Sequence, residues 1–424
     1  MNTQKKLMIQ LITINNTNME EIIMPTKQEL LNRLYPEDVL KLSADLTEGE
    51  VKVLAQLVEL LESKYRKDLN KHWTNCTVPE GFFEDLGKLG YKTNPLLFEG
   101  REGAKAPSQL FEFFFTYTLA RFDISLVTLL GVHSGLGFNS FLFGGDAAQR
   151  KEYLPKLASH ELRTCFALTE PLHGSDVAWG LDTTARREGD KWILNGEKRW
   201  IGGAIVADVI PVYARDEETG KPKCFIVERE QAGVEIDVIE NKIALKIVPN
   251  CNIKLTNVEV EESKRLQNIN GFKDIAKVLF STRAAVAFMA TGGMAGALQA
   301  TLKYVKEREQ FGNKIASYQL VQEKLAMMQA NLTQAMSLCV HIANLQEQGD
   351  YNEVVTSIGK MINSLRLRES VAMGRGICGG NGIVADYDIA RFFSDAEAVF
   401  TYEGTHEVNS LIIGRAMTGE AAFN

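Results

Sequence analysis

The spacing of hydrophobic residues changes twice along the chain and divides it into three regions. From about residue 27 to 160, apolar residues recur at helical intervals, most clearly over residues 51–65. After Arg163 come short β-like runs separated by turn signals such as Asn195-Gly196. From about Phe272 the helical spacing returns and holds to the end. The pattern therefore predicts an α+β fold in the order helices, strands, helices.

These changes give four predicted segments. Residues 1–26 form a tail that we expect to be disordered, 27–160 an N-terminal α domain, 161–271 a middle β-barrel or sandwich domain, and 272–424 a C-terminal four-helix bundle. Strands are predicted at residues 164–170, 191–195, 207–214, 224–228, 234–239 and 252–260. Long amphipathic helices are predicted at residues 275–308, 318–345 and 351–375. Small residues at 292–296, inside the first of these helices, predict a close contact with another helix.

Composition excludes several classes of protein. A net charge of −7 over 424 residues argues against nucleic-acid binding, which needs a basic face. The six cysteines form no C-x-x-C pair and the six histidines are scattered, so neither a metal site nor a disulfide framework is expected. No apolar run looks long enough for a membrane span. The chain does not end in a peroxisomal tripeptide, and we expect a reducing, cytoplasmic location.

The run Tyr402-Glu403-Gly404-Thr405 carries the strongest candidate for catalysis. A single carboxylate on a constrained turn, just after the Gly-rich run 376–382, is suited to taking a proton from a weakly acidic carbon. The alternative is that Glu403 only favours the positive end of a following helix. The motif alone leaves both interpretations open.

Four separated segments together resemble one family. They are residues 166–176, residues 194–201 followed by Ala207-Asp208, residues 308–312 with Gln319, and the pair formed by the Gly-rich run and the 402–405 turn. In this order they resemble the flavin-dependent acyl-CoA dehydrogenase and oxidase family, from about residue 30 to Phe423. Residues 397–406 and 414–419 look most like the branch of glutaryl-CoA dehydrogenase and the plant short-chain acyl-CoA oxidases. The resemblance implies a three-domain α/β/α fold, bound FAD and a homo-oligomer, commonly a tetramer.

The resemblance also assigns cofactor residues. Backbone groups of residues 166–169, the Thr169 hydroxyl and the Trp200 indole would hold the flavin ring, and Arg308 would pair with the diphosphate. Phe311 and Gln319 would flank the adenosine half from a neighbouring subunit. The alternative for Arg308 is an exposed charge at a helix end. The full set implied for FAD is Phe166, Leu168, Thr169, Gly174, Ser175, Trp200, Ile201, Gly202, Arg308, Phe311, Gln319, Gly376, Gly379, Gly380, Thr405 and Phe423.

The same comparison implies a substrate site and a reaction. Ser175, Phe280, Arg283 and Gly404 would contact the acyl-CoA. Glu403 would take the α proton of the thioester while the β hydrogen leaves as hydride for the flavin. The Glu403 amide and a ribityl hydroxyl would polarise the thioester carbonyl. Some branches carry the base on an earlier helix, but that position is Thr282 here, which cannot serve as a base.

Two departures from the branch shape the predicted reaction. Where glutaryl-CoA dehydrogenase binds its substrate carboxylate, this chain has Val127, Thr128 and Ala120, so we expect an uncharged acyl chain and no decarboxylation. Gly202-Gly203 replaces a Thr or Ser expected near the flavin, which leaves the electron acceptor open between an electron-transferring flavoprotein and oxygen. The missing peroxisomal ending favours the dehydrogenase.

Three functions stay in view. The first is acyl-CoA dehydrogenase, and the second is acyl-CoA oxidase, with glutaryl-CoA dehydrogenase as a further alternative within the same chemistry. The third is a family member with a binding or nucleic-acid-repair role. A member of that third class would have no base and would carry a basic surface. This sequence has Glu403 and a net charge of −7, so it fits neither expectation.

Overall fold

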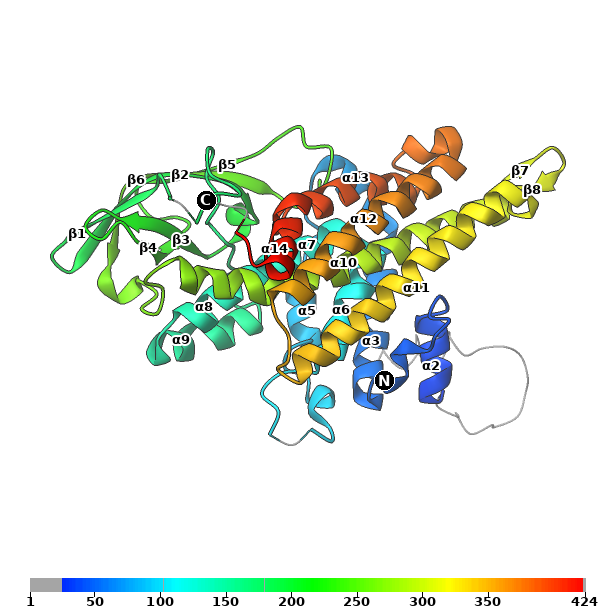
Figure 1. Cartoon of the computed structure of the whole chain (residues 1–424), viewed down its shortest axis with the longest axis horizontal. Coiled ribbons are helices and arrows are strands. Elements are labelled where there is room, and N and C mark those ends of the chain that lie inside the picture. The colour runs from blue at the N-terminus through cyan, green and yellow to red at the C-terminus, as the bar shows by residue number, and fades with distance from the viewer. Residues whose placement is uncertain (1–24, 102, 179, 422–424) are drawn as a thin grey trace, which may run out of the picture.

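The computed structural model describes residues 25–421 except residues 102 and 179. The predicted tail and Phe423 therefore lie almost wholly outside the described residues. Figure 1 shows a β-sheet region at one end of the molecule and helices over the rest of it. Two long antiparallel helices, α10 and α11, carry the chain to a small β7–β8 hairpin at the opposite end. The order helices, sheet, helices is the predicted one.

The N-terminal region is built from short helices with clear sequence signals for their starts. Thr26, Thr47 and Asp146 each cap a helix through a reciprocal capping box with the residue three positions later. A π-helical turn, Val132–Gly137, follows α7 and leads into α8. The helices are α2 (Lys27–Leu34), α3 (Glu48–Leu60), α4 (Leu69–Asn75), α5 (Phe82–Leu89), α6 (Gln109–Phe122), α7 (Ile124–Gly131), α8 (Phe138–Gly144) and α9 (Ala147–Ala158).

The predicted barrel or sandwich takes the form of one six-stranded sheet with the order β4-β3-β1-β2-β6-β5. Its pairs are antiparallel except β1 with β3, which is parallel. The strands are β1 (Thr184–Glu188), β2 (Lys191–Gly202), β3 (Val209–Asp216), β4 (Pro222–Glu228), β5 (Val234–Val238) and β6 (Asn250–Glu261). Sequence reasoning missed β1 because four of its five residues are polar and only Ala185 is buried.

Residues 164–170 are predicted as a strand, but in the structure they are not a strand of the sheet. The backbone of this segment pairs with β3 only through two isolated parallel bridges, Thr164 with Val209 and Ala167 with Val212. The reason is visible in the hydrogen bonds, because the carbonyl groups of Leu168 and Thr169 turn instead to Lys198 and Arg199 of β2. The segment is a connector that lies beside the sheet.

The C-terminal region is a helical bundle. Its long helices are α10 (Phe272–Glu307), α11 (Gln319–Glu347) and α12 (Glu353–Ile377), followed by α13 (Asp388–Thr401) and α14 (His406–Thr418). The β7 (Glu309–Gln310) and β8 (Asn313–Lys314) strands join α10 to α11. A Cβ atom on Gly292 would lie 2.3 Å from the Tyr117 carbonyl oxygen of α6, and one on Gly296 would lie 2.2 Å from the Phe392 ring of α13. The predicted close helix contact is confirmed.

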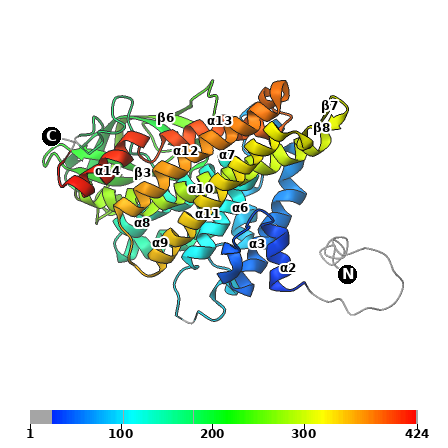
Figure 2. The same ribbon diagram turned by 45° about the vertical axis from the view of Figure 1, so that its right-hand side comes forward.

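Two helical segments are long and apolar enough to cross a membrane, by length and composition alone. They are Ile124–Gly144 and α10, and this differs from the expectation that no run reaches that length. Within the structure, 72% of the most apolar stretch of α10 and 50% of that in Ile124–Gly144 is buried. The hydrophobicity of α10 is explained by its central place among α6, α11, α12 and α13, seen in Figure 2.

Candidate active site

Glu403 lies in a strained turn between α13 and α14. Its backbone is in the left-handed region with φ of 55°, and Gly404 follows with φ of 85°. A non-glycine residue in this conformation is uncommon and costs about 1–3 kcal/mol, so the surrounding structure must hold it there. Such strain is typical of functional sites.

The structure argues against the helix-end interpretation of Glu403. The N-cap of α14 is Thr405, whose hydroxyl accepts the Val408 amide at 3.2 Å, and Glu407 is the acidic residue in the first turn. The Glu403 carboxylate instead points to α10, where it accepts a hydrogen bond from the Thr282 hydroxyl at 3.3 and 3.5 Å for its two oxygens. Its side chain is therefore directed into the bundle, away from the helix it precedes.

The environment of Glu403 tunes its basicity. Burial raises the pKa of Glu403 to about 7, while the charges of Arg283 and Lys360 and the Thr282 hydroxyl act to lower it. A carboxylate with a pKa near neutrality can exist in either protonation state at physiological pH and is suited to general acid–base work. No described residue accepts a hydrogen bond from the Glu403 amide N–H, so this donor is free for an external acceptor.

Of the two predicted substrate residues on α10, Arg283 acts on Glu403, whereas Phe280 contacts Tyr351. Phe280 stacks on Tyr351, with ring centroids 4.8 Å apart and planes at 12°. Arg283 is half-buried, donates to the Ser357 hydroxyl of α12 at 3.3 Å, and has a lowered pKa because of burial. The guanidinium thus lies deeper than a cation serving only solvent-exposed phosphates would, and its charge acts on Glu403. Sequence reasoning did not anticipate this second role.

The wall beside Tyr402 consists of Thr128 and its neighbour Val127 on α7 and Met289 on α10, and none of these three residues carries a charge. Val127 and Thr128 are buried on α7, and the Thr128 hydroxyl lies 3.2 Å from the Tyr402 hydroxyl. Tyr402 in turn donates to the Met289 sulfur of α10 at 2.8 Å. Hydroxyl, thioether and hydrocarbon groups are what this wall offers, and Ala120 is also fully buried. Sequence reasoning named Val127 and Thr128 but missed Met289, which the regular apolar spacing of α10 conceals.

A second group of predicted residues gathers where the 166–170 segment meets β2. Lys198 is fully buried and donates to Glu170 at 2.7 Å and to the Leu168 carbonyl at 3.1 Å. The amides of Asp182 and Thr183 also donate to Glu170, so the segment is fixed from both sides. The sequence placed Lys198 inside the Asn-Gly-Glu-Lys-Arg-Trp motif but gave no signal of this ion pair.

The end of β2 explains the unusual glycine pair. Trp200 has a left-handed backbone with φ of 66° and keeps 51% of its surface exposed, whereas Ile201 is buried. A Cβ on Gly202 would lie 3.3 Å from the Val132 side chain, and Gly203 has φ of 74°, which favours glycine. Close packing on the π-helical turn is therefore one physical reason for Gly202-Gly203.

Several observations fit a flavin dinucleotide at these residues. Leu168 is buried, yet its amide N–H donates to no described residue, and neither does that of Thr169. Buried amides are normally paired, so these donors are suited to a ligand with acceptor atoms. The half-exposed Trp200 offers an aromatic face, and a Cβ on Gly174 would meet nothing within 4 Å, which leaves the backbone beside Ser175 accessible.

The remaining predicted cofactor residues lie elsewhere in the chain. Arg308, Phe311 and Gln319 are exposed at the β7–β8 end of the bundle, and both views place this end far from the sheet. Phe311 is 93% exposed. The Gly376–Gly380 turn lies near them, because Asn381 donates to the Tyr304 hydroxyl at the end of α10 at 3.1 Å. One chain therefore does not bring both sets together.

The cofactor glycines at that end are open to an approaching molecule. A Cβ on Gly376, Gly379 or Gly380 would have no atom within 4 Å, which suits close contact between backbone and ligand. Thr405, by contrast, lies in the Glu403 turn, where its hydroxyl is engaged as a cap. The structure describes nothing of Phe423.

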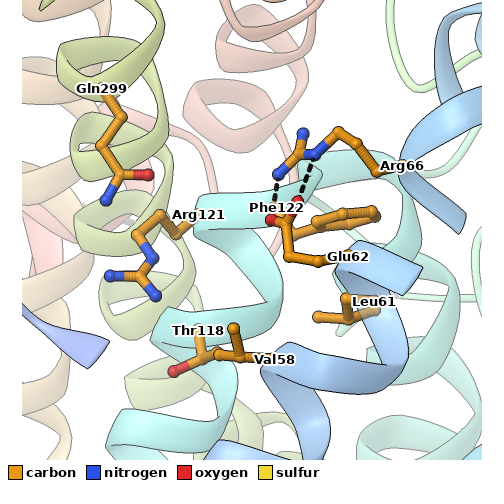
Figure 3. A pocket seen from close by; sticks show the side chains of 8 residues that line it. All are labelled: Val58, Leu61, Glu62, Arg66, Thr118, Arg121, Phe122 and Gln299. Carbon is orange, nitrogen blue, oxygen red and sulfur yellow. Dashed lines mark hydrogen bonds and ion pairs between the residues drawn. The ribbon is translucent and has the colours of Figure 1, made fainter. Parts of the chain in front are cut away.

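A small cavity of about 40 Å³ between α3, α6 and α10 does not compete with this site (Figure 3). Its two arginines are already paired, Arg66 with Glu62 at 2.6 Å and Arg121 with Glu37 at 2.8 Å. Pockets for small molecules usually measure about 300–1,000 Å³, and no predicted site residue lines this one. The lining side chains are Val58, Leu61, Glu62, Arg66, Thr118, Arg121, Phe122 and Gln299.

Comparison with known protein families covers nearly all of the described chain. Residues 47–161 match the model described as acyl-CoA dehydrogenase, N-terminal domain, and residues 165–258 match acyl-CoA dehydrogenase, middle domain. Residues 270–418 match acyl-CoA dehydrogenase, C-terminal domain.

Individual relatives agree with these matches. An acyl-CoA dehydrogenase of Bacillus subtilis (strain 168) is 32% identical over 80% of this chain and 90% of its own. A 3-(aryl)acrylate reductase of Clostridium sporogenes is 37% identical over 64% of this chain and 73% of its own. The crystal structure of a glutaryl-CoA dehydrogenase from Mycobacterium smegmatis in complex with FADH2 superimposes with a TM-score of 0.83 and 30% identity, covering 92% of this chain and 99% of that one.

Proposed function

The chain belongs to the acyl-CoA dehydrogenase family, and we propose that it desaturates an uncharged acyl-CoA between its α and β carbons without decarboxylation. Members of this family are FAD-dependent oxidoreductases, and the fold and cofactor predicted from the sequence are thereby confirmed. The substrate and the direction of the reaction are the parts that we propose.

The observation that carries the proposal is the state of Glu403. Its left-handed turn directs the carboxylate to Thr282 of α10, and its pKa of about 7 leaves a large fraction ionised at neutral pH. Abstraction of the α proton requires a base of this kind. It also requires donors that stabilise the negative charge that develops on the thioester carbonyl oxygen. The unpaired Glu403 amide supports that second requirement. Bound FAD supplies the acceptor for the β hydrogen.

The choice of an uncharged substrate rests on the wall beside Tyr402. Burying an unpaired carboxylate costs several kcal/mol or more, and Val127, Thr128 and Met289 provide no cation to pair with it. The glutaryl-CoA dehydrogenase relative is named for a dicarboxylate substrate, and the arylacrylate reductase for an aromatic one. We propose that this chain takes a simple fatty or related acyl group, as in β-oxidation.

Assembly and location are further parts of the proposal. The distance between the β7–β8 end and the sheet supports a homo-oligomer, a tetramer in the simplest case, in which a second copy brings Arg308, Phe311 and Gln319 to the cofactor. We propose a cytoplasmic enzyme that delivers its electrons to an electron-transferring flavoprotein. Direct transfer to oxygen, as in an acyl-CoA oxidase, is the second candidate, because Gly202-Gly203 replaces a hydroxyl-bearing residue.

The test is anaerobic mixing of the flavin-loaded protein with a panel of saturated acyl-CoAs of different length, branching and charge. Uncharged substrates should bleach the flavin absorbance, and glutaryl-CoA should not release carbon dioxide. Glu403→Gln should bind FAD normally and lose more than about 10²-fold in bleaching rate, as expected for a general base. Turnover of Glu403→Gln within tenfold of the wild type would refute the assignment of the base.

The acceptor is decided in a second step. Reduced protein is mixed either with air-saturated buffer or with an electron-transferring flavoprotein, and reoxidation is followed with peroxide formation. Rapid reoxidation by the flavoprotein without peroxide supports the dehydrogenase. Fast peroxide formation without an added acceptor supports the oxidase.

A further inference from the structure

Lys360 is a fully buried cation that contacts the backbone of the turn that carries Glu403. It lies on α12, three residues after Ser357, and its side chain has no solvent exposure. Its ammonium group donates to the Phe400 carbonyl at 2.8 Å and to the Gly404 carbonyl at 2.7 Å. A buried ammonium is costly unless it is well paired, and these two carbonyl acceptors offset the cost of burying the Lys360 charge.

The two carbonyl groups belong to residues on either side of Glu403 in the sequence. Phe400 is three residues before Glu403, and Gly404 is the residue after it. The Gly404 carbonyl also accepts from the Asn409 side chain at 2.9 Å, as does the Thr405 carbonyl. The turn is thus held at both ends by Lys360 and on one end also by Asn409. These contacts offset the strain of the left-handed Glu403 backbone.

We propose, on the basis of the function proposed above, that Lys360 is a positioning residue for Glu403. Its ammonium group fixes the orientation of the turn through the two carbonyls and places a positive charge beside the base. It does not touch the substrate and acts on the reaction only through Glu403.

The charges around the pair give this inference a measurable consequence. Arg283 from α10 and Lys360 from α12 are the cations that act on Glu403, and Glu403, Glu407 and Arg283 are the charges that act on Lys360. Burial, with Arg283, lowers the pKa of Lys360 to about 8, so most of it is still protonated at pH 7. Removal of this charge should raise the pKa of Glu403. The activity that depends on ionised Glu403 should then appear only at higher pH.

Lys242 provides a matched control. Its side chain is half-buried, and its ammonium group donates to the Leu245 and Val248 carbonyls at 2.8 and 2.6 Å and to the Asn250 side chain at 2.6 Å. Burial lowers its pKa to about 8 as well. It supports a loop of the middle region and is not among the groups that act on Glu403. A purely structural lysine should behave like Lys242.

The experiment compares Lys360→Met, Lys360→Gln, Lys360→Arg and Lys242→Met in the flavin-loaded protein, with a reactive acyl-CoA from the panel. Flavin content and thermal midpoint are measured first, and then kcat and KM between pH 5.5 and 9.5. We expect Lys360→Met to lose about 10- to 100-fold in kcat with KM within a few-fold, the usual cost of a misplaced catalytic group. The acidic limb of its kcat profile, where the rate rises with pH as Glu403 ionises, should move up by about one pH unit, as expected for the loss of one neighbouring charge.

The other variants separate charge from hydrogen bonding. Lys360→Gln keeps a donor without the charge, so its acidic limb should shift like that of Lys360→Met while its kcat falls less. Lys360→Arg keeps the charge, so its limb should return to the wild-type position. Lys242→Met should lower the thermal midpoint and leave the limb in place.

Clear outcomes would overturn the inference. It fails if the acidic limb of Lys360→Met stays in place or if Lys242→Met shifts it equally. If Lys360→Met loses FAD, the test rests on Lys360→Gln and Lys360→Arg. The inference is then refuted if the acidic limbs of these two variants lie at the same pH. Inactive Glu403→Gln with an unmoved limb in Lys360→Met would reject only the role of Lys360. Active Glu403→Gln would reject the assignment of Glu403 as the base, on which this inference rests.

Discussion

Replacement of Thr282 by valine tests whether its hydroxyl supports the ionised form of Glu403. The hydroxyl has one proton, and it has two classes of acceptor within reach, because the Leu279 carbonyl lies 3.2 Å away and the Glu403 oxygens lie at 3.3 and 3.5 Å. Valine has nearly the same shape and removes the donor. Thr282→Ser keeps the hydroxyl and is the matched control.

The expected effect can be worked out from these distances. Hydrogen bonds to charged groups contribute about 1.5–3 kcal/mol, but contacts of this length are beyond the usual O–H···O range and the proton is shared. We therefore assign about 1 kcal/mol, which corresponds to a rise of about 0.7 in the pKa of Glu403. From a starting value of about 7, the ionised fraction at pH 7 would fall from about one half to about one sixth.

The assay is the rate of flavin bleaching as a function of pH. At pH 7 Thr282→Val should react about threefold more slowly than the wild type, and above pH 9 the two rates should converge, since Glu403 is then ionised in both. Thr282→Ser should follow the wild type at every pH. An unchanged profile for Thr282→Val would refute the reasoning and show that the hydroxyl proton is shared with the backbone carbonyls of Val278 and Leu279 instead.

Three further predictions concern stability. Lys198→Met leaves the buried Glu170 carboxylate without its cation, so the free energy of unfolding should fall by about 3–5 kcal/mol and flavin content should drop; denaturant unfolding checks this, and addition of Glu170→Leu should recover part of the loss. Gly296→Ala drives a Cβ to 2.2 Å from the Phe392 ring and 2.4 Å from the Arg121 carbonyl, and should destabilise by more than about 2 kcal/mol. Gly414→Ala, where a Cβ meets nothing within 4 Å, should stabilise α14 by about 0.5–1 kcal/mol, and a comparable loss in both variants would contradict the packing argument.

The sequence predicts the order of the regions well because the hydrophobic period is a local property. Helix α10 was placed at residues 275–308 and occupies Phe272–Glu307, and β6 also falls on its predicted run. The prediction failed where local pattern and tertiary role disagree. Strand β1 is too polar to show alternation, and the apolar 164–170 segment gives up its strand hydrogen bonds to Lys198 and Arg199.

The candidate site divides in the same way. Glu403 and Trp200 could be named from motifs, and Thr282 from the position at which other branches of the family carry the base. Their partners could not. Thr282 and Glu403 are 121 residues apart, and Lys360 and Gly404 are 44 apart. The motif that contains Lys198 gives no sign of its ion pair, because its burial against Glu170 depends on how β2 packs beside the connector.

The basicity of Glu403 is a balance that no single residue determines. Burial alone would hold the carboxyl in its neutral form, while Arg283, Lys360 and Thr282 favour the ionised form. The two cations come from different helices of the bundle, and a small displacement of α12 against α10 would change both the orientation and the charge of the base. For this reason we expect variants at the α10–α12 contact, such as those at Ser357, to move the pH profile before they affect flavin binding. The site is thus a property of the bundle as much as of the turn that carries Glu403.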